Sequence, residues 1–394
     1  MQRATQAGVK TALVLAVSAM LTGCAGFFTP QGTGTNTGTA STDIVYVANA
    51  NADSLAAYSI ASGTLTAVTG SPFALGFAPT AVVVAESNAY LYVSSGNAIY
   101  LYNISSTGAL TIGNSSAAVA ANITPAAMDV SPDGNWLAIL NSDGVHLYLY
   151  QITTSGTSLG HLTALSTTIL TATTPVAQAV KFAPNGEALF VALGTGGDVG
   201  FSFTTSTGAL GAAQALAEPT GDSDNALAID SNSARIYIAR SGSTAPGLYV
   251  FSIGTNASLT AVTGTPNVTT GDSAPHSVVL DKTSTYVYAG DRSSSTVTGY
   301  SISASNGTVM LTSISGSPFA TGEAPVGLAA DNSDAYILAI SDGLSGGVPS
   351  TAVAGSPDLE MYGFDANSAG RLYAVSSTTT GSDPTGPIAI ATTH

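Results

Sequence analysis

The sequence predicts an all-β fold, a seven-bladed β-propeller with four antiparallel strands per blade. Short apolar runs alternate with polar turns, and no helical periodicity interrupts them. An aromatic residue recurs in one of these runs at intervals of 44 to 62 residues: Tyr58, Tyr102, Tyr150, Phe201, Phe251, Tyr300 and Tyr362. A period near 50 residues is typical of a unit that buries its apolar face only by stacking on copies of itself.

Each repeat begins with a first strand that usually opens at a proline: Pro79, Pro125, Pro175, Pro275 and Pro325. One repeat places Asn225 where the proline is expected. A polar turn such as Ser131–Gly134 or Ala183–Gly186 then reverses the chain, because Asp-Gly and Asn-Gly favour tight turns between antiparallel strands.

The second strands are predicted at 44–48, 91–94, 136–140, 189–192, 236–239, 286–289 and 336–340. The aromatic third strand follows, and a turn containing Gly63, Gly108, Gly160 or Gly208 leads into the fourth. The pattern starts at a second strand and ends with an unpaired first strand, 386–391. We therefore expect this C-terminal strand to pair into the N-terminal blade and close the ring, which removes exposed sheet edges.

Residues 1–24 have the pattern of a bacterial lipoprotein signal peptide. Arg3 and Lys10 form the basic start, 11–20 the apolar stretch, and Leu21-Thr-Gly-Cys24 the lipid-attachment box, which contains the only cysteine. The alternative is a generic signal or a short membrane anchor with an incidental cysteine. We expect lipidation at Cys24, a flexible Gly/Thr-rich tether over 25–42 and the propeller over 43–394. The protein would then be extracytoplasmic, with the membrane as a partner through its lipid anchor. Resemblance to other bacterial lipoproteins, with Ala25 next to the cysteine, implies sorting to the outer membrane if the cell has two membranes.

The composition is acidic and poor in charge. The chain has 8 basic and 23 acidic residues, a net charge of −15, and charged residues make up 8% of it, against about 25% in ordinary domains. Nucleic acid is excluded as a partner, because binding it requires clustered Lys and Arg. A surface of hydroxyls and amides suits an extracytoplasmic protein.

One face of the propeller is predicted to carry the function. The loops that enter the first strands and those between second and third strands lie on the same face, and loops at one rim of a scaffold are where binding residues gather. The predicted catalytic residues there are His276, Asp291, Arg240 and Arg292, and the predicted binding residues are Asp224, Asp272 and Glu323.

A histidine oriented by a carboxylate and flanked by two guanidinium groups suits the hydrolysis of a lactone or ester. His276 would act as general base towards water, and the arginines would hold the carbonyl oxyanion. The alternative is that His276 is a satisfied strand residue and that both arginines pair with neighbouring carboxylates.

We expect no metal and no other cofactor. Asp222-Ser-Asp-Asn225 spaces oxygen atoms like the start of a calcium loop, but lacks the glycine and the distal glutamate of an EF-hand. His146, His161 and His394 are too scattered to form a zinc site. A long Gly/Ser/Pro-rich loop, 341–357, either covers the central opening or is a disordered insertion.

Four segments resemble the seven-bladed lactonase family of 6-phosphogluconolactonase-like and carboxymuconate-cyclising enzymes, and its relatives with Tyr-Val-Thr-Asn repeats. They are Tyr46-Val-Ala-Asn, Gly63-Thr-Leu-Thr, Gly70-Ser-Pro-Phe73 and Gly316-Ser-Pro-Phe319. The resemblance covers about 43–394 and implies the propeller fold. It also implies lactone hydrolysis, with His276 at the family's blade-entry histidine and Asp291 near a position where glutamate is often found. A 6-phosphosugar calls for several converging cations, and this face offers only Arg240 and Arg292.

Two functions therefore remain open. The first is a membrane-anchored binding or scaffold module that holds a small molecule, glycan or protein of the envelope at its loop-bearing face. The second is a lactone hydrolase that acts on a sugar or related lactone. Convergence of the four predicted catalytic side chains on a shared cavity would favour the second.

Overall fold

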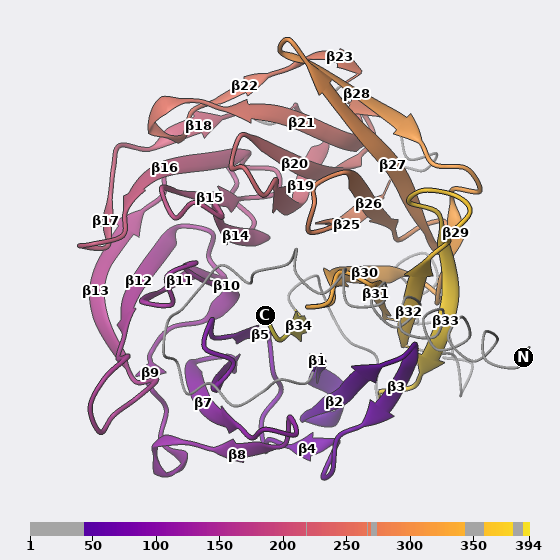
Figure 1. Ribbon diagram of the computed structural model, residues 1–394. Coiled ribbons are helices and arrows are strands. Elements are labelled where there is room, and N and C mark those ends of the chain that lie inside the picture. Colours follow the sequence, from indigo (N-terminus) through magenta and orange to yellow (C-terminus); the bar gives the residue numbers. More distant parts are fainter. Residues whose placement is uncertain (1–42, 218, 266, 269–273, 343–357, 381–388) are drawn as a thin grey trace, which may run out of the picture. The chain divides into compact units, whose positions relative to one another are not determined.

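The structure is a computed structural model, which describes residues 43–394 except 218, 266, 269–273, 343–357 and 381–388. Seven sheets, each with four antiparallel main strands, are arranged in a ring, so the predicted seven-bladed propeller is confirmed (Figure 1). The proposed signal peptide, Cys24, the tether and residues 343–357 of the long loop lie outside the described residues. None of the helical segments in the described part has the length and apolarity to span a bilayer.

The strands of each blade follow one another from the centre of the ring outwards (Figure 1). The first strands are β34 (Ile390–Thr392), β5 (Ala81–Val84), β10 (Pro125–Val130), β14 (Ala179–Phe182), β19 (Asp222–Ile229), β25 (Pro275–Leu280) and β30 (Pro325–Ala330). The second strands are β1 (Asp43–Asn49), β6 (Tyr90–Ser94), β11 (Trp136–Asn141), β15 (Ala188–Ala192), β20 (Arg235–Gly242), β26 (Tyr286–Asp291) and β31 (Tyr336–Ser341). Every predicted second strand is thus present.

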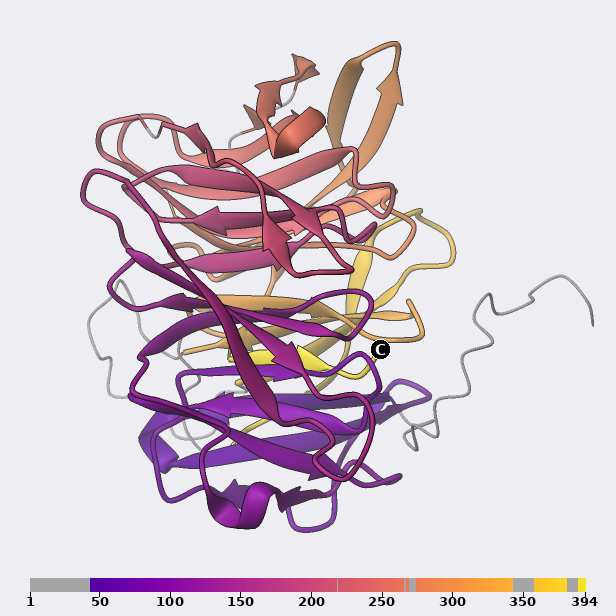
Figure 2. The ribbon, with the colours of Figure 1, turned by 90° about the vertical axis from the view of Figure 1, so that its left-hand side faces the viewer.

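The outer strands complete the blades, which Figure 2 shows from the side. The third strands are β2 (Ser54–Ala61), β7 (Ala98–Ile104), β12 (His146–Ile152), β16 (Asp198–Thr204), β21 (Gly247–Ile253), β27 (Thr296–Ser305) and β32 (Leu359–Phe364). The fourth strands are β3 (Thr64–Ala67), β8 (Leu110–Ile112), β13 (Leu162–Ile169), β17 (Ala209–Leu210), β22 (Leu259–Ala261), β28 (Thr308–Ser313) and β33 (Leu372–Thr378). Short edge strands extend five blades: β4 (Phe73–Ala74), β9 (Ala120–Ala121), β18 (Gln214–Leu216), β24 (Asn267–Val268), β23 (Thr263–Thr265) and β29 (Phe319–Ala320). Three-residue 3₁₀ helices are η1 (Ala50–Ala52), η2 (Asn114–Ser116) and η3 (Thr255–Ala257).

The recurring aromatic residue occupies the same register in every blade. It lies in the third strand opposite a fully buried aliphatic residue of the second, as in Val45–Tyr58 and Leu137–Tyr150. These pairs stack between neighbouring blades, where the hydrophobic clusters of the core lie. The sequence period therefore reflects a packing position that each blade must fill.

Neighbouring blades are also joined by a repeated hydrogen bond. The hydroxyl of Tyr46 donates to the Gly108 carbonyl of the next blade at 2.9 Å, and Tyr92 and Tyr288 donate in the same way to Gly160 and Gly370. Gly108 has a φ of +82°, and a Cβ atom there would lie 2.7 Å from Ile44. Gly108, Gly160 and Gly370 thus permit both the turn before the fourth strand and the close contact between blades.

The ring closes as predicted. β34 pairs antiparallel with β1, with Tyr46 opposite Ala391, and Thr393 exchanges two hydrogen bonds with Ile44 at 3.0 Å each. Asn88 of the following blade forms two further hydrogen bonds with the backbone of His394, both at 2.8 Å. The first strand of blade 1 is therefore supplied by the C-terminal end of the chain.

The first strands of four blades carry a β-bulge that shifts the expected register. The bulges follow Pro125, Asp224, Pro275 and Pro325. Asp224, not Asn225, occupies the proline position of blade 5, so the prediction for Asn225 was wrong by one residue. Pro175 likewise precedes β14 by four residues instead of opening it. Bulges re-aim side chains and are frequent beside active sites.

Candidate functional site

His276 is the bulged residue of blade 6. It lies between Pro275 and Ser277, which pair with Asp291 and Gly290 of β26. Its Nδ1 atom is 3.0 Å from the Ala274 carbonyl oxygen, and because that oxygen only accepts, Nδ1 carries the proton. In the neutral ring the Nε2 atom is then the acceptor. Burial lowers the pKa of His276, and the nearby charge of Arg292 lowers it further, so the ring is neutral at pH 7.

Arg292 and His276 are both hydrogen-bonded to the Ala274 carbonyl oxygen. The Arg292 backbone N–H donates to this oxygen at 3.0 Å, and the Arg292 guanidinium Nη2 pairs with the Asp342 carboxylate of blade 7. Its Nε atom is buried and has no hydrogen-bond partner within the described part of the chain. A buried donor without a partner is costly, so this N–H is a candidate contact for a ligand.

Arg240 is occupied by a structural ion pair. Its Nε and Nη2 atoms donate to the two carboxylate oxygens of Asp224 at 2.8 and 3.0 Å, and both side chains are buried. The guanidinium carbon also lies 4.0 Å from the centre of the Tyr249 ring. The alternative interpretation, that arginines on this face pair with carboxylates, therefore describes Arg240 well.

The other predicted residues are Asp291, Glu323 and Asp272. Asp291 is fully buried opposite Pro275, and its Oδ1 accepts the Ser293 N–H at 3.3 Å. The Nδ1 proton of His276 is held by the Ala274 carbonyl, where the sequence suggested Asp291 as the orienting group. Glu323 is half-buried just before β30. Asp272 falls outside the described residues.

The oxygen atoms of the calcium-like segment have other roles. The Asp222 carboxylate accepts the backbone N–H groups of Thr244 and Ala245, both at 2.9 Å, while Asp224 holds Arg240. Among the described residues, no group of three His, Cys, Asp or Glu side chains could hold a metal ion.

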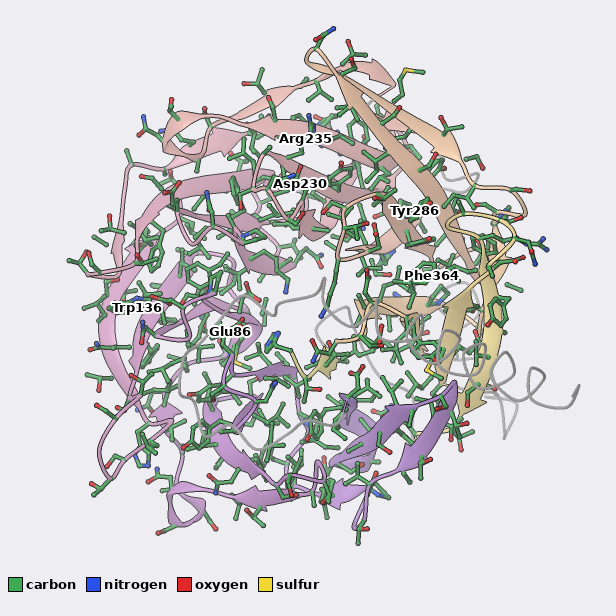
Figure 3. The ribbon with its side chains drawn as sticks, viewed as in Figure 1. Glu86, Trp136, Asp230, Arg235, Tyr286 and Phe364 are labelled. Atoms are coloured by element: carbon green, nitrogen blue, oxygen red, sulfur yellow. The ribbon has the colours of Figure 1, made fainter. Side chains whose placement is uncertain are left out.

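A central cavity lies along the first strands, on the side of the turns between first and second strands. The residues that line it were not identified from the sequence. Its volume is about 570 Å³, and its lining runs from Ser277 to turn residues such as Glu86 and Lys282. Figure 3 shows Glu86 beside the centre of the ring. His276, Asp291, Arg240 and Arg292 are not in the lining of this cavity, so within the described residues the four do not converge on it.

A positional signal in the sequence could have revealed the cavity. In each blade the penultimate residue of the first strand lines the cavity. These residues are Val83, Asp129, Lys181, Ala228, Val279, Ala329 and Ala391. Only Asp129 and Lys181 are charged, and they pair at 2.9 Å. Lys181 lies within β14. Reading one strand position across all repeats would have identified this ring.

The fold and the cavity define the protein as a seven-bladed β-propeller with a central ligand-sized space. The family described as lactonase, 7-bladed beta-propeller, matches residues 179–326, which confirms the resemblance seen in the sequence. No curated protein matches the chain significantly.

The solved structures similar to this chain include proteins named as lactonases. A candidate 6-phosphogluconolactonase of Bacteroides fragilis has 15% identity and a TM-score of 0.69, with 90% of this chain and 99% of that chain covered. The periplasmic gluconolactonase PpgL of Pseudomonas aeruginosa has 12% identity and a TM-score of 0.65, with 90% and 99% covered. At these identities the likeness shows a shared fold.

Proposed function

We propose that the protein hydrolyses a lactone at the rim of blade 6, with His276 as general base and Arg292 as oxyanion donor. The observation that carries the proposal is the state of His276. Its Nδ1 proton is bound by the Ala274 carbonyl and its pKa is lowered, so a neutral ring presents Nε2 as the basic atom. The lactonase family match over 179–326 supports the same reaction class.

The reaction follows from these two side chains. His276 Nε2 takes a proton from a water molecule as the water oxygen attacks the lactone carbonyl carbon. As negative charge develops on the carbonyl oxygen, this oxygen accepts a hydrogen bond from the Nε–H of Arg292, which has no partner among the described residues. The ring C–O bond then breaks, and the leaving alkoxide oxygen takes the proton back from His276, which yields a hydroxy acid.

The charge around the site favours a substrate without phosphate. Arg240 is neutralised by Asp224, and one end of Arg292 is bound to Asp342. Recognition of a phosphate group requires several free converging donors, which these pairs do not provide. We therefore propose an unphosphorylated sugar lactone or a related lactone as the substrate class.

The same proposal places the protein outside the cytoplasm, attached through a lipid on Cys24 to the cell envelope. The basic, apolar and Leu-Thr-Gly-Cys segments of 1–24 support this attachment, and sorting to the outer membrane is its finer form. Labelling with a radioactive fatty acid tests it. The label should be incorporated by the wild-type chain and lost in Cys24→Ala, and incorporation in both would contradict the proposal.

The test of the activity compares two histidines. Purified protein is assayed by acid release from sugar and aromatic lactones, with subtraction of spontaneous hydrolysis. His276→Ala should lower kcat/KM by about 10²- to 10⁴-fold, the usual contribution of a general base. The control is His161→Ala, because His161 lies in the turn before β13, far from blade 6 in the ring. No turnover by the wild type, or equal loss in both variants, would reject the site.

A binding function is the second candidate, and the central cavity favours it. A space of about 570 Å³ falls within the range of small-molecule sites. Absence of turnover combined with saturable binding of a small ligand would select this function over hydrolysis.

A further inference from the structure

Glu86 stands apart from the other charged residues of the cavity lining. It lies in the turn after β5, and its closest ionic partner is His394 Nε2 at 3.8 Å, beyond hydrogen-bond distance. No hydrogen bond to its carboxylate is present among the described residues. Burial raises the pKa of Glu86, and the nearby charges of His394 and Lys181 offset this rise only in part.

The other acids of the lining already have partners. Asp129 accepts from Lys181 Nζ at 2.9 Å and from the Phe182 N–H at 2.7 Å. Asp281 accepts the Tyr286 N–H at 2.6 Å and is bonded to the Thr283 hydroxyl. An incoming group would therefore find Glu86 as the acceptor that still requires a donor.

The two lysines of the lining are also engaged. Lys181 is bound to Asp129, and Lys282 Nζ donates to the Asn332 backbone and side-chain oxygens. An anionic ligand would have to compete for these ammonium groups and would be repelled by Glu86. A neutral ligand would bury the Glu86 carboxylate further without pairing it. A cation avoids both costs.

The walls between the charged groups are apolar. Val83, Ala228, Val279 and Ala329 face the cavity from four different blades. They suit a short hydrocarbon body, whose burial contributes roughly 25 cal/mol per Å² of apolar area. The net charge of −15 also raises the concentration of small cations near the protein.

We propose that the central cavity binds a small organic cation, an ammonium group on a short apolar body, with Glu86 as its counter-ion. The ammonium group lies at the turn-side end, where its N–H groups donate to the Glu86 carboxylate. The hydrocarbon body extends along the first strands towards Ser277. The site is separate from His276, so the inference does not depend on the proposed lactone hydrolysis.

The test compares three probes of equal length that differ in charge: hexylammonium, 1-hexanol and hexanoate. Their dissociation constants for the full chain are measured by isothermal titration calorimetry at pH 7.5. Hexylammonium should bind at least about tenfold more tightly than 1-hexanol, because a hydrogen bond to a charged group contributes about 1.5–3 kcal/mol. Hexanoate should bind most weakly.

Glu86→Gln keeps the shape of the side chain and removes its charge, so it should abolish the preference for hexylammonium over 1-hexanol. The control is Glu187→Gln, because Glu187 is an exposed carboxylate in the turn after β14 that does not line the cavity. The Glu187→Gln variant should prefer hexylammonium over 1-hexanol as strongly as the wild type does.

Val279→Trp, which fills the cavity, should weaken binding of all three probes. Ala329→Leu fills less of the cavity and replaces Val279→Trp if that variant does not fold. Equal affinities in the wild type, a preference retained in Glu86→Gln, strongest binding of hexanoate or no binding of any probe would overturn the proposal.

Discussion

Blades 5 and 6 have the same strand order and the same bulge, yet they use the bulged residue differently. In blade 5 the Asn225 amide donates to the Ser241 hydroxyl at 2.8 Å and to the Pro275 carbonyl of the next blade at 2.9 Å. In blade 6 the equivalent His276 makes one ring hydrogen bond, to Ala274, and its Nε2 atom has no described partner. The same backbone feature thus fastens two blades in one case and presents a basic nitrogen in the other.

The partners of the preceding residue sharpen this contrast. In blade 5 the residue before the bulge is Asp224, which holds Arg240 in a buried ion pair. In blade 6 it is Pro275, which lies opposite Asp291 of the second strand. In blade 5 the arginine therefore pairs within its own blade, whereas Arg292 of blade 6 pairs with Asp342 of blade 7 and lies near His276, which can accept a proton.

The largest effect is expected from Arg240→Ala. The substitution leaves the fully buried Asp224 carboxylate without its counter-ion, which costs about 3–5 kcal/mol of unfolding free energy. Urea unfolding followed by fluorescence measures the loss. Asp224→Asn in the same chain should restore part of it, because the uncompensated charge is then gone. A loss under 1 kcal/mol would show that the ion pair does not distinguish blade 5.

The next effect is on activity, from His276→Asn, which gives blade 6 the bulge residue of blade 5. Asparagine cannot accept a proton at neutral pH, so lactone hydrolysis should fall by about 10²- to 10⁴-fold. The free energy of unfolding should change by less than about 1 kcal/mol, because His276 makes only one ring hydrogen bond. Retained activity would remove the functional difference between the two blades.

A smaller effect is expected from Asn225→Ala. It removes the hydrogen bonds to Ser241 and to the Pro275 carbonyl, and the buried carbonyl loses a donor. The cost is about 1–3 kcal/mol in unfolding free energy, measured by urea titration. Hydrolysis by the variant should stay within a few-fold of the wild type, since Asn225 does not touch His276 through any described contact. A selective loss of activity would mean that Asn225 positions the site through Pro275.

The sequence predicted the fold because packing in every blade imposes the same residue type at the same place. Tyr58 and Tyr150 fill equivalent positions against Val45 and Leu137, and such repetition is visible without coordinates. The closing strand was equally visible, since a ring that begins at a second strand needs a first strand from elsewhere. The bulges could not be predicted, because no residue type in the sequence marks the extra position. Asn225 was therefore misplaced by one position.

The candidate site was predicted only in part. The Ala274 carbonyl oxygen is bonded to both the His276 ring and the Arg292 backbone N–H, so these two predicted residues do lie together. The pairing of Arg240 with a neighbouring carboxylate was an open alternative, but the choice of Asp224 depends on the bulge that places the two residues opposite each other. The place of Glu86 in the cavity lining could not be inferred either, because the sequence of a surface turn and that of a turn lining a cavity do not differ.

The smallest effect is a pH dependence that blade 6 has and blade 5 lacks. The pKa of His276 is lowered in the folded protein, so the unfolded chain binds the proton more readily. The stability that His276 contributes is therefore complete above its unfolded pKa of about 6.5 and is lost as the pH falls below that value. The free energy of unfolding of the wild type should decrease relative to His276→Asn between pH 7.5 and pH 5.5.

Asp43 would mask this trend in the wild type alone. Burial and a hydrogen bond with Asp331 raise the pKa of Asp43 to about 6, so its contribution is present in acid and is lost as the pH rises through 6. That dependence has the opposite sign to the one from His276, and the two overlap near pH 6. The difference in unfolding free energy between wild type and His276→Asn cancels the contribution of Asp43, because both proteins keep Asp43.

Asn225→Ala provides the blade 5 comparison, since the difference in unfolding free energy between this variant and the wild type should not change with pH. A wild type that gains stability relative to His276→Asn as the pH falls would show that His276 is protonated in the folded protein, and this would remove the basic nitrogen on which the contrast between the blades depends.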